Sequence, residues 1–104
     1  MIVRILEGTV KAGAEATFAA FARERLPAFR QVAGVRTIHL ARRMTPDGTV
    51  EFAWVSVWDD PAALAAFDAT SGNPPAFVRD LGDIVASWRL RHLETFDDAV
   101  APGD

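Results

Sequence analysis

The stretch from Val50 to Phe67, VEFAWVSVWDDPAALAAF, decides the fold of this chain. Its first half, Val50–Trp58, is rich in β-branched and aromatic residues and lacks glycine and proline, which predicts a β-strand. Side chains alternate across a strand, so one face carries Val50, Phe52, Trp54, Ser56 and Trp58 and the other carries Glu51, Ala53, Val55 and Val57. Both faces are mainly apolar, so we expect each to be covered by a partner.

The residues that follow this strand predict a helix. Asp60 is a good N-cap, and Pro61 suits the first helical position because its missing N–H is not needed there. Leu64 and Phe67 then form an apolar pair at helical spacing. The helices of the chain can cover one face of the strand. The other face must be covered from outside a single small sheet, most simply by a second copy of the molecule.

On the N-terminal side, the sequence predicts strands over Ile2–Val10 and Val35–Arg43, with a helix between them from Ala14 to about Val32. The helix has one apolar stripe, formed by Phe18, Phe21, Ala22, Leu26 and Phe29. Pro27 removes one intrahelical hydrogen bond, so we expect a kink there, or a break followed by a second short helical piece.

The connections carry clear turn signals. Met44–Gly48 contains Pro-Asp-Gly and predicts that the second and third strands form a hairpin. The helix after Pro61 is expected to fade near Ala69, before the break Thr70–Pro75. A short helix over Ala76–Leu81 and a fourth strand over Ala86–Phe96 follow. We expect a single domain over residues 1–96 and a loose acidic tail over residues 97–104.

The order of elements is β-α-β-β-α-β, which predicts an α+β, ferredoxin-like fold with an antiparallel sheet. Right-handed crossovers place the first and third strands in the middle of the sheet. With helices on one face only, the apolar residues of the other face form an exposed patch, and such patches usually mark an interface. The patch comprises Val3, Ile5, Ala53, Val55 and Val57. We therefore expect a two-fold homodimer packed sheet against sheet.

Composition narrows the classes of function. The chain has 104 residues, no cysteine and a net charge of −3, which argues against a disulfide framework, a thiolate metal site and a nucleic-acid-binding surface. His39 and His92 have no metal-ligand spacing, so no metal site is expected. There is no apolar run of membrane-spanning length, and the N-terminus does not resemble a signal peptide. We expect a cytoplasmic protein without membrane contact.

A family resemblance covers Ile2 to Phe96. The residues that carry it are Val10-Lys11-Ala12-Gly13, Ala33-Gly34-Val35 and, above all, Ser56–Phe67, where a strand-end Trp is followed by an acidic cap and Ala-Leu-x-x-Phe. In these features the chain resembles the antibiotic biosynthesis monooxygenase domains of the dimeric α+β barrel superfamily. The resemblance implies a pocket between sheet and helices. In oxygenase members this pocket receives a flat aromatic or polyketide substrate, which reacts with O₂ without flavin, haem or metal, so we expect no cofactor.

The resemblance also directs attention to particular residues. Candidate substrate-binding residues are Trp54, Ser56, Phe52, Phe67 and Arg4, where Arg4 would hold an anionic substrate; the alternative is that the aromatic side chains simply fill the core. Trp58, at the strand end, and His92, as a base near neutral pH, are the catalytic candidates.

The chain departs from the family pattern at the catalytic positions. Characterised oxygenase members have an Asn four residues before the strand-end Trp and a Tyr six residues after it, where this chain has Trp54 and Leu64. A haem-degrading branch uses an Asn on the first strand and a His beyond the Trp. This chain has Leu6 near the first position and no His between Trp58 and His92, so haem degradation is not expected.

Three hypotheses remain open on the sequence. The first is a cofactor-independent monooxygenase acting on a small aromatic or quinone-forming, polyketide-like compound. The second is a non-catalytic dimeric module that binds a small hydrophobic ligand. The third is an isomerase or lyase of the same barrel type.

Overall fold

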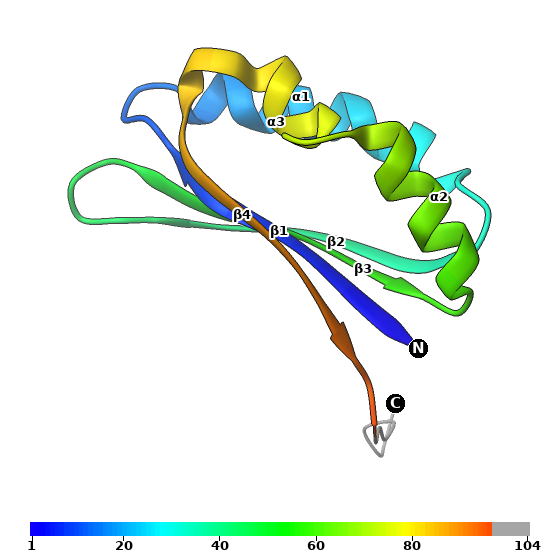
Figure 1. Ribbon diagram of the computed structural model, residues 1–104. Helices are drawn as coiled ribbons and strands as arrows, with labels where there is room; N and C mark the ends of the chain where they lie inside the picture. The colour runs from blue at the N-terminus through cyan, green and yellow to red at the C-terminus, as the bar shows by residue number, and fades with distance from the viewer. Residues whose placement is uncertain (97–104) are drawn as a thin grey trace.

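The computed structural model describes residues 1–96, and its helices lie together on one side of a sheet (Figure 1). The predicted acidic tail, residues 97–104, lies outside the described residues. The elements in chain order are β1 (Ile2–Val10), α1 (Glu15–Arg30), β2 (Val35–Met44), β3 (Val50–Trp58), α2 (Pro61–Ser71), α3 (Ala76–Leu81), a 3₁₀ turn (Gly82–Ile84) and β4 (Val85–Glu94). The predicted ferredoxin-like order of elements is confirmed.

The sheet has four strands in the order β2-β3-β1-β4, and every neighbouring pair is antiparallel. β1 and β3 therefore lie in the middle, as the crossover rule predicts. Burial along β3 alternates without exception between buried and half-buried residues. The fully covered face of β3 points to the helices, and the half-buried face forms the open side of the sheet.

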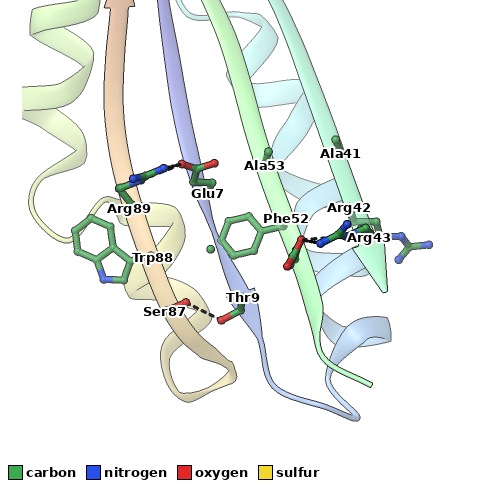
Figure 2. Close-up of a pocket in the computed structure, with 12 residues that line it drawn as sticks. Glu7, Thr9, Ala41, Arg42, Arg43, Phe52, Ala53, Ser87, Trp88 and Arg89 are labelled. Carbon is green, nitrogen blue, oxygen red and sulfur yellow. Dashed lines mark hydrogen bonds and ion pairs between the residues drawn. The ribbon is translucent and has the colours of Figure 1, made fainter. Parts of the chain in front are cut away.

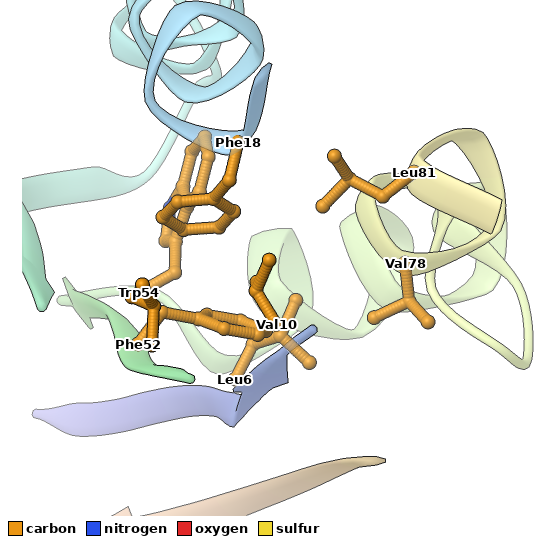
Figure 3. Packing of buried hydrophobic residues seen from close by; sticks show 8 residues of the cluster. Leu6, Val10, Phe18, Phe52, Trp54, Val78 and Leu81 are labelled. Atoms are coloured by element: carbon orange, nitrogen blue, oxygen red, sulfur yellow. The ribbon is translucent and has the colours of Figure 1, made fainter. Parts of the chain in front are cut away.

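The core fills the space between this covered face and the helices (Figure 3). Leu6 and Val10 of β1 lie beside Trp54 and Phe52 of β3, and the ring of Phe18 from α1 packs 5.0 Å from that of Phe52. Val78 and Leu81 of α3 close the far side of the same cluster. Burial of these side chains is the main favourable term in the stability of the fold.

α1 runs through Pro27 without a break, so the alternative of two separate helical pieces is wrong. The proline is exposed and lies in the last turns of a helix that ends at Arg30. The one carbonyl that loses its intrahelical partner belongs to Arg23, an exposed residue, so water can satisfy it.

The β2–β3 hairpin forms as predicted around the turn Met44–Gly48. The backbone N–H of Thr45 donates to the carbonyl of Thr49 at 2.9 Å, and the N–H of Gly48 donates to the carbonyl of Thr45 at 3.0 Å. The carboxylate of Asp47 accepts hydrogen bonds from the side chains of Thr45 and Thr49, and these bonds lower its pKa to about 2.

The second half of the chain begins at a side-chain cap. Asp60 accepts a hydrogen bond of 2.9 Å from the backbone N–H of Ala62, and Pro61 opens α2 as expected. The helix does not fade near Ala69 but continues to Ser71. The buried hydroxyl of Ser71 then accepts from the N–H of Ala76, which links the end of α2 to the start of α3.

Two glycines in the left-handed region offer a matched test of this packing. Gly34, at φ +89°, lies so close to α2 that an added Cβ would be 2.4 Å from the Cβ of Ala63, whereas Gly13, at φ +85°, has nothing within 4 Å. We expect Gly13→Ala to lower the free energy of unfolding by about 1–2 kcal/mol, the conformational cost alone. Gly34→Ala should cost about 1–3 kcal/mol more, because α2 must shift. Urea unfolding followed by tryptophan fluorescence measures both, and equal losses would contradict this account.

Candidate functional site

A cavity of about 220 Å³ lies between the sheet and the helices. Its floor comes from β1 and β3, and its walls come from α1, α2 and the start of α3. The lining is mostly apolar and aromatic; it comprises Arg4, Leu6, Arg25, Ala28, Phe29, Val32, Trp54, Phe67, Ser71, Pro75, Ala76 and Phe77. A concave apolar site with a few polar groups is the usual form of a small-molecule pocket.

The aromatic walls support one another. The ring of Phe29 lies 5.1 Å from Trp54 and 4.8 Å from Phe67, and the ring of Phe77 lies 4.6 Å from Trp54. These tilted and edge-to-face arrangements are the favourable ones for aromatic pairs. The shape of the cavity is therefore held by contacts between four different elements, without a ligand.

Arg4 supplies the buried charge of the cavity lining. Its side chain projects from the covered face of β1 and is 2% exposed. Its Nε donates to Oδ1 of Asp68 at 2.8 Å, and its Cζ lies 5.0 Å from the centre of the Phe67 ring. A guanidinium in such a place needs a partner, because burying an isolated charge costs several kcal/mol.

Asp68 connects this arginine to a histidine on the neighbouring strand. Its other oxygen, Oδ2, lies 2.9 Å from Nε2 of His92. The register of the sheet explains the meeting, since Arg4 of β1 is paired directly with His92 of β4. We call Arg4, Asp68 and His92 the charge cluster. Asp68 was missed at the sequence level, although it is the one charged residue in an otherwise apolar or hydroxyl-bearing α2, PAALAAFDATS.

The structure divides the predicted site residues into two groups. Arg4, Trp54 and Phe67 line the cavity. Phe52 belongs to the core beside Phe18, and His92 lies beyond Arg4 and Asp68, outside the cavity lining.

Ser56 and Trp58 form a closed pair under α2. Both are 0% exposed, and Nε1 of Trp58 donates to Oγ of Ser56 at 2.9 Å. Neither lines the cavity, but the ring of Trp58 lies 5.4 Å from Phe67 and 6.2 Å from Phe29. Trp58 thus supports two cavity walls from behind. By contrast, Nε1 of the cavity residue Trp54 is buried and has no hydrogen-bond partner among residues 1–96.

A second, larger hollow of about 510 Å³ lies over the end of the open sheet face (Figure 2). Four of its five charged lining residues pair across the strands: Arg89 contacts Glu7 at 2.6 Å, and Arg43 contacts Glu51 at 2.7 Å. The hydrogen bond from Arg89, helped by the charge of Arg91, lowers the pKa of Glu7. Because most of these charges are already paired, we place the candidate site in the smaller, aromatic cavity.

Comparison with known proteins agrees with this architecture. The family model described as antibiotic biosynthesis monooxygenase matches residues 1–77, which run from β1 into α3. The chain belongs to the antibiotic biosynthesis monooxygenase family. A comparison with curated proteins found no significant match.

Solved structures of this family share the fold. A protein assigned to the family from Deinococcus radiodurans has a TM-score of 0.74 at 20% identity, over 99% of this chain and 100% of that one. One from Bordetella bronchiseptica has a TM-score of 0.68 at 20% identity, over 90% and 95%. The heme-degrader MhuD from Mycobacterium tuberculosis, solved with two hemes in its active site, has a TM-score of 0.69 at 20% identity, over 96% and 100%.

Residues 1–96 contain no group of three or more His, Cys, Asp or Glu side chains placed to hold a metal ion. Over the same residues, no helix is both long enough and apolar enough to cross a membrane.

The Ser56–Trp58 pair can be tested for its proposed role, which is to support the cavity walls without lining the cavity. Ser56→Ala leaves the buried indole N–H of Trp58 without its acceptor, so we expect a loss of about 1–3 kcal/mol in the free energy of unfolding. Ser87→Ala, which removes an exposed hydroxyl on β4 and its solvent-exposed hydrogen bond to Thr9, is the matched control and should cost less than about 0.5 kcal/mol. Urea unfolding measures both. A Ser56→Ala variant as stable as the control would show that the hydrogen bond contributes nothing.

Proposed function

We propose that this member of the antibiotic biosynthesis monooxygenase family oxidises a small, electron-rich aromatic compound with O₂ and without a cofactor. The observation that carries the proposal is the preformed aromatic cavity with the guanidinium of Arg4 in its lining. Trp54, Phe29 and Phe67 would pack against the faces and edges of a flat ring. Arg4 would favour the anionic form of the substrate.

The volume of the cavity limits the size of the substrate. A cavity of about 150 Å³ in another protein binds benzene, and pockets for drug-sized ligands have about 300–1,000 Å³. The 220 Å³ found here fits one substituted ring. A polycyclic polyketide or a haem is larger, so we propose neither as the substrate.

Oxidation of a phenol to a quinone fits the groups that line this cavity. One O₂ supplies one oxygen atom to the ring carbon and leaves the other as water, so phenol and O₂ balance quinone and water without an outside reductant. The titratable groups of the lining are Arg4 and Arg25, and neither is a base at neutral pH. The protein would then bind the phenolate, which can itself reduce O₂, and exclude water. His92 would act indirectly, by holding Asp68 against Arg4.

A homodimer is part of the same proposal. Val3, Ile5 and Val55 lie half-buried on the open sheet face, and Leu93 on β4 is 47% exposed next to Val3. Covering these side chains with the same face of a second copy would remove apolar surface from water.

One observation supports the second hypothesis, a non-catalytic binding module. The cavity lining offers no carboxylate or imidazole to take a proton from a substrate. The same observation disfavours an isomerase or lyase, which needs such a base at the reacting carbon.

Oxygen consumption tests the proposed reaction. With single-ring hydroquinones and phenols we expect uptake of O₂ that rises with pH along the titration of each substrate, because the enzyme supplies no base. Ala76→Phe, which fills the cavity, should abolish uptake, while Ala20→Phe on the exposed side of α1 should not. An oxygen electrode measures the rates. Ligand binding without uptake by any compound would favour the binding module instead.

Light scattering tests the dimer. The purified protein should have a mass of about 23 kDa, twice the 11.3 kDa of one chain. Val55→Lys places a charge in the centre of the open face and should give monomers, whereas Ala66→Lys on the exposed side of α2 should not. A monomeric wild type at micromolar concentration would refute this part of the proposal.

A further inference from the structure

We infer that the cavity selects a ring that carries a carboxylate, and that the terminal nitrogens of Arg4 bind this carboxylate. The inference rests on the proposed function in taking the aromatic cavity as the substrate site. It goes further by naming the substrate class, a small hydroxylated aromatic carboxylate, and the residue that selects it.

Among residues 1–96, the hydrogen bonds and ion pairs of Arg4 involve its Nε and not its two terminal nitrogens. The Nε is used by Asp68 at 2.8 Å, and one face lies over the ring of Phe67. A guanidinium has five N–H donors, and four of them are on the terminal nitrogens. The side chain is 2% exposed and forms part of the cavity lining, so a ligand in the cavity can supply an acceptor for these donors.

A carboxylate matches this edge better than a single oxygen does. The two terminal nitrogens present parallel N–H groups, which bind the two oxygens of a carboxylate in a fork. A phenolate offers one oxygen and would accept a hydrogen bond from only one of the two parallel N–H groups. A ring bearing a carboxylate at Arg4 would place its apolar part against the cavity-facing sides of Phe29 and Trp54, which contact each other with their ring centres 5.1 Å apart.

The charge cluster makes room for the additional negative charge. Asp68 neutralises Arg4, but its second oxygen is 2.9 Å from His92. When His92 is protonated, the three side chains carry one net positive charge, which a carboxylate ligand neutralises. Asp68 is then a positioning residue, since it fixes the plane of the guanidinium through Nε and leaves the terminal edge to the ligand.

Calorimetry with two probes of the same shape tests the inference. 4-Hydroxybenzoate carries the carboxylate, and 4-hydroxybenzamide is its neutral counterpart. The wild type should bind the carboxylate about tenfold to a hundredfold more tightly, the value of a charge-assisted pair over a neutral one. Arg4→Gln should remove this preference. Because that variant removes the arginine partner of Asp68 and can fail to fold, the double variant Arg4→Gln/Asp68→Asn removes both charges together.

Arg36→Gln, which removes an exposed arginine paired with Asp59, is the matched control and should keep the preference. Equal binding of the two probes by the wild type, no binding of either, or a preference that survives in the double variant would each overturn the inference. Oxygen uptake is followed separately. A carboxylate preference without oxygen uptake would support the inference and refute the proposed reaction. Oxidation of neutral phenols without a carboxylate preference would support the proposed reaction and refute the inference.

Discussion

The apolar character of both faces of β3 is the constraint on which the rest of the structure depends. On the covered face, Phe52, Trp54 and Trp58 are buried by the helices, and on the other face Val55 and Val57 remain half-buried. A strand of this kind favours a central position in the sheet, with its more apolar face covered by the helices. The position of β3 between β2 and β1 and the placement of both long helices on one face follow from it. The half-buried other face is the surface through which we propose that a second copy binds.

The ion pair between buried Arg4 and half-buried Asp68 is hard to explain by stability alone. Replacing a buried charge pair with apolar residues of similar size is often neutral or stabilising. Arg4 nevertheless lies in the layer occupied by Leu6 and Trp54, where it pairs with Asp68 of α2, which in turn contacts His92 of β4. A charge kept at a cavity lined by aromatic rings has a use if the cavity receives a ligand with opposite charge.

The sequence predicted the fold well because the fold depends on local patterns. Each of three patterns can be recognised over a few residues: the alternation along β3, the cap at Asp60 and the turn at Asp47. Together they determine the order of strands. The site depends on contacts between distant residues. The alternation of side chains along the strand placed Ser56 and Trp58 on the correct face. Only the packing of α2 shows that the two side chains are hydrogen-bonded to each other and do not line the cavity.

Asp68 is a second residue whose role could not be predicted from local sequence patterns. Its isolation in an apolar helix was visible in the sequence, but its role requires the pairing of Arg4 with His92 across β1 and β4, separated by most of the chain. The family match covers residues 1–77 and therefore includes Arg4 and Asp68, while His92 lies beyond it on an edge strand. An edge strand can change its side chains without disturbing the central pair of strands, because it has one neighbour in the sheet. A side chain there that acts on Arg4 through Asp68 can therefore alter ligand charge preference while the aromatic cavity and its supports stay the same.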